Sequence, residues 1–293
     1  MLSPPAFTAA GRVAILTAMI IDAHTHVFPP EVVADRERFL AGEPFFSGIY
    51  ADPQAPMVTA EGLVAAMDQD GVDVSWALGF PWVRQENSRL HNDYLAAAVA
   101  AHPARLRGLA CVHPPAGWAA AEAERSLGLG LSGLGELAFY DSDLDLPALA
   151  PLCALCAEAG RPLLLHTNEP VGHLYPGKAP MTLKALYDLL KTHPATRFVL
   201  AHMAGGLFFY AALKKEAQAV LANTWLDTAA APFLYRPRAY ALAVELMGPG
   251  KLVYGSDFHL LALPSYQKEL AHAGLSPAEL DLVMGGAAAA LIP

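Results

Sequence analysis

The chain has 293 residues, of which 54% are hydrophobic and 16% are charged, and its formal net charge is −9. This much apolar material can bury a large core, so the composition excludes an intrinsically disordered protein. The acidic balance argues against a nucleic-acid partner, because binding to phosphates needs a basic face.

The N-terminal segment, residues 1–18, has a short apolar stretch but no long hydrophobic region and no clear cleavage site. A second methionine, Met19, stands just before the first strand-like pattern. We therefore expect residues 1–18 to form an extension outside the main domain, which covers residues 19–293.

Eight short and nearly continuous apolar runs predict parallel strands that are buried on both faces. In chain order they are residues 19–23, 72–79, 107–112, 133–137, 162–166, 197–202, 224–227 and 252–255.

Longer runs with helical spacing lie between the predicted strands. They are residues 60–70, 91–102, 118–127, 146–159, 183–193, 207–221 and 240–247, followed by a C-terminal stretch from residue 277. Gly71 and Gly160 stand where helix C-caps belong. Eight alternating strands and helices in one domain predict an α/β fold of the TIM type, a (β/α)8 barrel. The connections 27–59 and 167–181 are unusually long and follow strand ends, where the active sites of such barrels lie.

The strongest chemical signal is Asp22-Ala-His24-Thr-His26 at the end of the first predicted strand. Side chains two residues apart on a strand point to the same side, so His24 and His26 can face one ion. Neutral imidazole suits zinc and similar divalent metals. An isolated HxH is nevertheless a weak signal that chance can produce.

Four later strands also end in a potential ligand, namely Glu136, His166, His202 and Asp257. Each of these groups alone is more simply interpreted as a satisfied core residue. Polar groups are costly to bury without partners, however, and all of these would meet at one barrel mouth. The complete set therefore predicts a metal site, with Asp227 at the end of the seventh strand orienting one of the ligand histidines.

This arrangement, with HxH on strand one, His on strands five and six and Asp on strand eight, resembles the amidohydrolase superfamily. Residues 19–30 and 252–258 are similar to its amidohydrolase-related branch, amidohydrolase 2, and the resemblance extends from Met19 to the C-terminus. It implies the barrel fold, one or two divalent ions and usually hydrolysis. That branch also contains non-oxidative decarboxylases of aromatic and related acids.

The resemblance implies that His24, His26 and His166 bind the metal, most simply zinc, as one or two ions. It implies that Asp257 binds the metal or its water and transfers protons, and that His202 is a further ligand or polarises the substrate. No lysine ends strand four, so the carbamylated-lysine bridge of many relatives is lacking. Glu136 stands there instead, similar to relatives that bridge two ions with Glu. The tail at residues 283–291 departs from the usual Gly-Asn-Ala motif.

Three functions remain open. We expect a hydrolase in which a metal lowers the pKa of bound water to about 7 and a carboxylate accepts the proton. The alternative is a metal-dependent decarboxylase, for which an arginine should bind the substrate carboxylate. Arg84 and Arg238 are the candidates. The third is a barrel that binds a ligand without catalysis, against which the complete ligand set argues.

Residues on the loops after the strands are candidates for substrate binding, with ordinary loop packing as the alternative for each. These candidates are Glu169, His173, Tyr175, Trp82, Arg84 and Tyr235.

The remaining expectations concern partners and compartment. The three cysteines are too few and odd in number for a disulfide framework, which favours a reducing, cytoplasmic setting. No apolar run approaches the ~20 residues that span a bilayer. We expect a small-molecule substrate and no nucleic-acid or membrane partner, and a homo-oligomer remains open.

Overall fold

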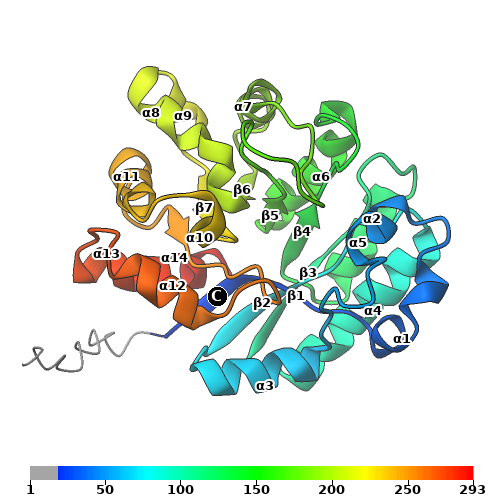
Figure 1. The fold of residues 1–293 in the computed structure, drawn as a ribbon. Coiled ribbons are helices and arrows are strands. Elements are labelled where there is room, and N and C mark those ends of the chain that lie inside the picture. Colours follow the sequence, from blue (N-terminus) through cyan, green and yellow to red (C-terminus); the bar gives the residue numbers. More distant parts are fainter. Residues whose placement is uncertain (1–18, 293) are drawn as a thin grey trace, which may run out of the picture.

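Eight parallel strands follow one another around a barrel in the order of the sequence, with helices outside them (Figure 1). The computed structural model describes residues 19–292, and the predicted extension over residues 1–18 lies outside them. The strands are β1 Ile21–His26, β2 Val74–Leu78, β3 Leu106–Ala110, β4 Gly133–Leu137, β5 Pro162–Leu165, β6 Arg197–Leu200, β7 Thr224–Asp227 and β8 Leu252–Val253. Ala23 N donates to Tyr254 O at 2.8 Å and joins β1 to the chain after β8. The predicted (β/α)8 barrel is confirmed.

The helices lie between the strands and around the barrel ends. They are α1 Pro30–Ala34, η1 Arg36–Phe39, α2 Pro44–Tyr50, α3 Ala60–Asp70, α4 Gln85–Ala101, α5 Ala119–Gly128, α6 Leu146–Ala159, α7 Leu183–Thr192, η2 His202–Phe209, α8 Tyr210–Leu213, α9 Ala217–Val220, α10 Ala231–Leu234, α11 Arg238–Met247, α12 Leu263–Leu270, α13 Pro277–Asp281, η3 Leu282–Gly286 and α14 Ala287–Leu291. Gly71 and Gly160 cap α3 and α6 in the left-handed conformation, as predicted.

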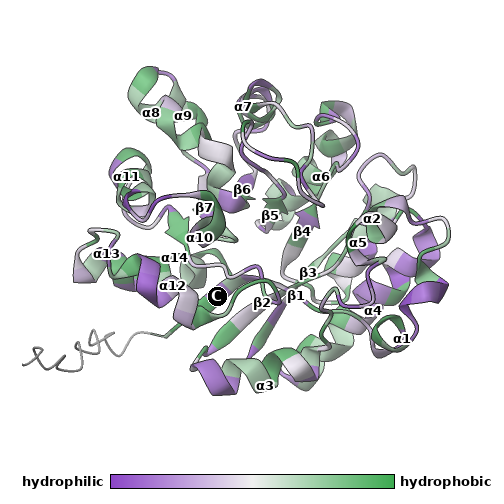
Figure 2. Ribbon diagram, viewed as in Figure 1, coloured by the Kyte–Doolittle hydropathy of each residue, from purple (hydrophilic) through white to green (hydrophobic). Residues whose placement is uncertain are grey.

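Apolar side chains fill the barrel interior at the ends where the strands begin. Trp76, Leu164 and Val199 pack there with Leu291 of α14. Gly285 lies directly against the backbone of Met19 and Ile21, where a side chain would not fit. The C-terminal elements therefore close the bottom of the barrel and leave its upper end for polar groups. Figure 2 shows hydrophilic residues on outer helices such as α12.

The predicted helix over residues 207–221 is wrong, because this part of the chain forms three short pieces. Met203 to Gly206 adopt left-handed φ angles inside η2, and Lys214 is extended between α8 and α9. Gly205 lies so close to the Asn168 carbonyl that a side chain there would collide with it. The sharp turn after β6 therefore depends on contact with the connection after β5.

The long connection after β1 folds around its own apolar core. We call Phe28, Val32, Phe39, Phe45, Phe46, Phe80 and Trp82 the aromatic wall. The Phe46 and Trp82 ring centroids are 4.6 Å apart. This packing fixes the connection beside the barrel mouth.

No helix within residues 19–292 combines the length and the hydropathy that crossing a bilayer requires.

Candidate metal centre and its cavity

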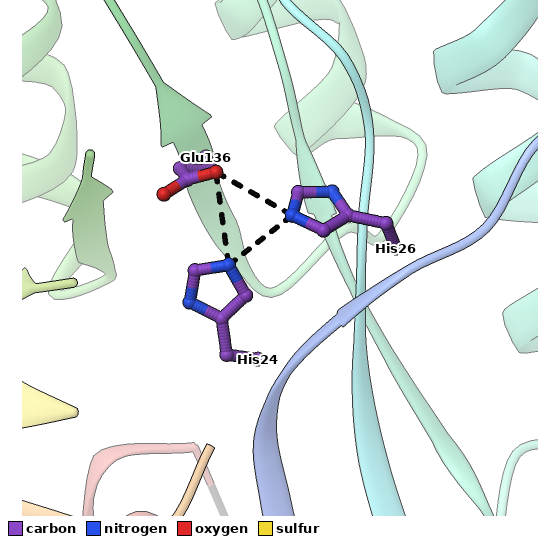
Figure 3. A group of neighbouring side chains, drawn as sticks. All are labelled: His24, His26 and Glu136. Carbon is purple, nitrogen blue, oxygen red and sulfur yellow. Dashed lines mark hydrogen bonds and ion pairs between the residues drawn. The ribbon is translucent and has the colours of Figure 1, made fainter. Parts of the chain in front are cut away.

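His24 and His26 lie at the upper end of β1 and point toward Glu136 of β4 (Figure 3). The pairing of β1 with β2 shifts register between Asp22 and Thr25, and such irregularities redirect side chains near active sites. The Nε2 atoms of His24 and His26 are 3.2 Å apart. The two imidazoles thus converge, as their spacing on the strand predicts.

Asp227 at the end of β7 fixes the orientation of His24. Its Oδ2 lies 2.8 Å from Nδ1 of His24, and both side chains are fully buried. A proton on Nδ1 then donates to the carboxylate and leaves Nε2 as a free lone pair facing the cavity. This contact agrees with the orienting role predicted for Asp227.

Two carboxylates complete this side of the site. Oε2 of Glu136 is 3.6 Å from Nε2 of His24 and 3.4 Å from Nε2 of His26. Oδ1 of Asp257 is 3.6 Å and 3.5 Å from the same two nitrogens. Ligands about 2.1 Å from one ion are separated by about 3.0–3.4 Å, so these side chains fit a divalent cation after small adjustments.

Glu136 also faces a second pair of histidines. Its Oε1 is 3.1 Å from Nδ1 of His166 and 3.8 Å from Nε2 of His202. Nδ1 of His202 is 2.9 Å from the Ala229 carbonyl, to which it can donate. Nε2 of His166 is buried without a hydrogen-bond partner in the described part of the chain. Glu136 thus stands between two candidate ligand groups, and the buried nitrogen of His166 is available to a metal or a substrate.

The charges in the site favour a bound cation. Burial raises the pKa of Glu136, but the charges of His24 and His166 outweigh this and hold it well below its usual range. Burial lowers the pKa of His26, whereas hydrogen bonds to Asp257 and Glu136 raise it to about 9. The carboxylates therefore hold protons on the imidazoles, and a divalent ion can replace those protons.

A cavity of about 620 Å³ opens above this cluster. Its lining includes His26, Glu136, His166, His202 and Asp257, with Phe28, Ile49, Tyr50, Met57, Phe80, Tyr140 and Leu234 among the remaining residues. Aromatic and aliphatic side chains therefore surround the polar groups, as in many small-molecule sites.

The predicted substrate-binding residues divide into two groups. His173 and Tyr175 line the cavity. Glu169 lies behind them, where its carboxylate accepts hydrogen bonds from the Tyr175 hydroxyl and Lys178 Nζ. Tyr235 donates its hydroxyl to the His202 carbonyl at 3.1 Å.

The other two candidates are directed elsewhere. Trp82 is buried in the aromatic wall, and its Nε1 donates to Nδ1 of His91 at 2.9 Å. Arg84 donates through Nε to Glu86 at 2.7 Å. Both follow a strand end, as a ligand-binding residue does, but the packing of the connection after β1 turns them away from the cavity.

The cavity lining also includes two tyrosines that are not among the sequence candidates, Tyr50 and Tyr140. Burial, together with the charges of Glu136 and Asp257, raises the pKa of both phenols, so they remain neutral donors. The position of Tyr140 after β4 is a signal that sequence reasoning can use. Tyr50 comes from α2 inside the long connection, where only the connection length gives a hint.

Solved structures with the same fold include enzymes that catalyse reactions other than hydrolysis. The structure is similar to a 5-carboxyvanillate decarboxylase from Novosphingobium aromaticivorans complexed with manganese and 4-hydroxy-3-methoxy-5-nitrobenzoic acid, with 16% identity and a TM-score of 0.73 over 94% of this chain and 96% of that one. A dihydroxybenzoic acid decarboxylase from a Polaromonas species, with bound manganese and 2-nitroresorcinol, has 18% identity and a TM-score of 0.68 over 94% and 97%. A 4-oxalomesaconate hydratase from Rhodopseudomonas palustris has 16% identity and a TM-score of 0.63 over 94% and 96%.

These neighbours correct two expectations. Hydrolysis, our main prediction, is contradicted, because two of these three structures are decarboxylases, the alternative that we had left open, and the third is a hydratase. Manganese in two of them supports a divalent metal and gives no support to zinc in particular. The hydrolysis prediction rested on Glu136 as a bridging carboxylate, and a carboxylate in that place does not distinguish the two reactions.

Sequence comparison identifies the family. A search of the curated proteins found no significant match. The Amidohydro_2 family model, described as Amidohydrolase, matches residues 21–293. The solved structures that this chain resembles are enzymes that act on small molecules. The predicted resemblance is therefore confirmed, and the chain belongs to the Amidohydro_2 family of amidohydrolases.

Proposed function

We propose that this enzyme is a metal-dependent, non-oxidative decarboxylase of a small aromatic acid. The supporting observation is that an aromatic cavity opens directly onto a cluster of imidazoles and carboxylates. Phe28, Phe80 and Tyr140 offer flat apolar surfaces to a ring. The decarboxylase neighbours support the same reading at the level of the fold.

The residues that would hold a divalent ion are His24, His26 and Asp257, with Glu136 and His166 completing the set. Three imidazoles with two carboxylates suit manganese, zinc or iron(II) alike, so the donor set does not select one of them. When bound, the ion supplies positive charge that binds oxygen ligands and stabilises negative charge developing on them.

Decarboxylation requires a proton at the carbon that loses the carboxylate. The bond from the ring carbon to the carboxylate breaks, its electron pair stays on the ring carbon, and one proton is taken up as CO2 leaves. Burial raises the pKa of Asp257, but the hydrogen bond with His26 and the charge of His24 lower it below its usual range. Asp257 therefore enters as a carboxylate, and we assign His202, which lines the same cavity, to supply the proton that Asp257 passes on.

The direct test is turnover of aromatic acids by the manganese-loaded protein in D2O. With 2,6-dihydroxybenzoate and other hydroxybenzoates, we expect CO2 and an arene with one deuterium at the vacated ring position. Mass spectrometry and a CO2 assay measure both products. If a fully metallated protein releases no CO2 from any aromatic acid of this size, the proposal fails.

The variant Asp257→Asn separates metal binding from proton transfer. Asn keeps the size and one oxygen donor but cannot carry the transferred proton. We expect much of the metal to remain while turnover falls by about 10²–10⁴-fold, the usual contribution of a positioned acid or base. His24→Ala is the matched control, because it should chiefly reduce metal content. Near-normal turnover of metallated Asp257→Asn would remove the proposed role.

The variant Glu136→Gln tests whether Glu136 bridges two ions. If it does, elemental analysis should show fewer ions per chain in the variant than in the unmodified protein. If Glu136 only supports the neighbouring histidines, the metal content should hold and activity should fall modestly. A variant with unchanged metal and unchanged activity would place Glu136 outside the site.

A further inference from the structure

The cavity has residues that would hold a metal ion, and that ion could bind one substrate carboxylate. No lysine or arginine of the described residues lines the cavity to bind a second carboxylate. We propose, on the basis of the decarboxylase function above, that the substrate carries a single carboxylate, the one that is lost, and is otherwise uncharged. The substrate class is then a hydroxylated or alkoxylated aromatic monoacid rather than an aromatic diacid.

Few charged side chains face the cavity. Within residues 19–292, neither lysine nor arginine lines it, so the arginine that we expected to bind the substrate carboxylate of a decarboxylase, Arg84 or Arg238, is not found there. The acidic groups of the lining are Glu136 and Asp257, both of which belong to the candidate metal centre. Away from that centre the lining is mostly apolar, so a second substrate carboxylate would lose its water without gaining a counter-charge.

The basic residues on the neighbouring loops have other partners. Arg84 pairs with Glu86, and its side chain is about half exposed to solvent. Lys178 Nζ is 2.8 Å from Oε1 of Glu169 and also donates to the carbonyls of Val171 and His173. With these contacts satisfied, neither side chain is available to hold a substrate anion in the cavity.

The cavity offers neutral hydrogen-bond donors in place of a cation. The phenols of Tyr50 and Tyr140 line it and remain protonated, because burial and the nearby carboxylates raise their pKa values. A neutral phenol donates one hydrogen bond to a hydroxyl or methoxy oxygen but does not neutralise an anion. The imidazoles of His173 and His259 also line the cavity.

A matched set of three nitro compounds tests the proposal by calorimetric binding to the manganese-loaded protein at pH 8. The first is 4-hydroxy-3-methoxy-5-nitrobenzoic acid, the second is its methyl ester, and the third is 2-methoxy-6-nitrophenol, which lacks the carboxylate. All three share the nitro, hydroxyl and methoxy groups, and the planar nitro group imitates the reacting carboxylate. We expect the ester and the nitrophenol to bind and the acid to bind at least about tenfold more weakly.

A variant that adds the missing cation sharpens this test. Leu260 lines the cavity and is 53% exposed, so it tolerates a longer side chain. We expect Leu260→Arg to narrow the difference between acid and ester, whereas Leu260→Gln, the uncharged control, should leave it unchanged.

The outcomes separate the two proposals. If the acid binds as tightly as the ester in the unmodified protein, the single-carboxylate inference is overturned while the decarboxylase function stands. If the ester is as weak as the acid and only the nitrophenol binds, size rather than charge excludes the acid, and the inference is again overturned. If none of the three binds the metallated protein, the inference is overturned, and the decarboxylase function is then decided separately by the CO2 assay described above.

Discussion

The two long connections at the barrel mouth, residues 27–59 after β1 and 167–181 after β5, are built in different ways. The first contains α1, η1 and α2 and packs its aromatic residues into the aromatic wall, where Phe46 is fully buried. The second has no helix between Thr167 and Met181, and Val171 and Leu174 are 73% and 87% exposed.

The second connection is held by polar contacts instead. Lys178 and Tyr175 both donate to Glu169, and Asn168 Oδ1 accepts from Ala179 N at 2.8 Å. Equal position in the fold therefore does not mean equal stability. The first connection should behave as part of the core, and the second should open without unfolding the barrel.

The largest effect that this comparison predicts is at Trp82, whose side chain is 1% exposed within the aromatic wall. Trp82→Ala removes the contacts with Phe46 and Phe39 and leaves His91 without its donor. We expect the free energy of unfolding to fall by about 3–5 kcal/mol, as for other large aromatic truncations. Denaturant unfolding measures this.

The control for Trp82→Ala is Val171→Ala in the second connection, where the side chain is mostly exposed. Its free energy of unfolding should stay within about 0.5 kcal/mol of the unmodified protein. Equal losses in the two variants would show that the connections do not differ as we infer.

The next effect is a loss of stability at acid pH, which arises where His91 of α4 contacts Val27 in the first connection. His91 Nε2 is 2.7 Å from the Val27 carbonyl, to which it can donate, and burial lowers the pKa of His91 to about 4. In the unfolded chain the pKa is near 6.5, so below that pH the unfolded state binds a proton that the folded state does not. Stability is then complete above pH 6.5 and falls as the pH drops toward 4, by about 2–3 kcal/mol at pH 4.5.

The variant His91→Gln measures how much of the stability loss at low pH comes from His91, because glutamine keeps a donor and an acceptor but does not titrate. We expect the variant to be less stable at pH 7 and to lose less stability between pH 7 and pH 4.5 than the unmodified protein. Parallel stability curves for the two proteins over that interval would rule out His91 as the source.

The sequence was sufficient to predict which strand ends meet, because a parallel barrel brings them to one edge. His24 and His26 share a side through their spacing, and Glu136, His166 and Asp257 follow apolar strand runs. The geometry follows from the topology, so local patterns were enough.

Contacts between distant segments were not predictable in the same way. The turn at Gly205 depends on its approach to the Asn168 carbonyl, and no local pattern reports that approach. Trp82, a predicted substrate-binding residue, is buried in the aromatic wall, whereas Tyr50, which was not a candidate, lines the cavity. Both depend on how residues 27–59 fold as a unit, which helix and strand periodicity do not determine.

The smallest global effect is expected at Lys178, and it tests the second connection directly. The Lys178 and Glu169 side chains are only 8% and 16% exposed, so Lys178→Met leaves a poorly solvated carboxylate. In a rigid core this would cost several kcal/mol, but an opening connection can return Glu169 to water. We expect limited proteolysis within residues 167–181 to become faster while the free energy of unfolding changes by less than about 1 kcal/mol.

Lys184→Met is the control, because its ion pair with Asp188 is exposed and its loss should change neither measurement. A loss of global stability as large as that of Trp82→Ala, with no faster cleavage, would mean that the second connection is as firmly part of the core as the first.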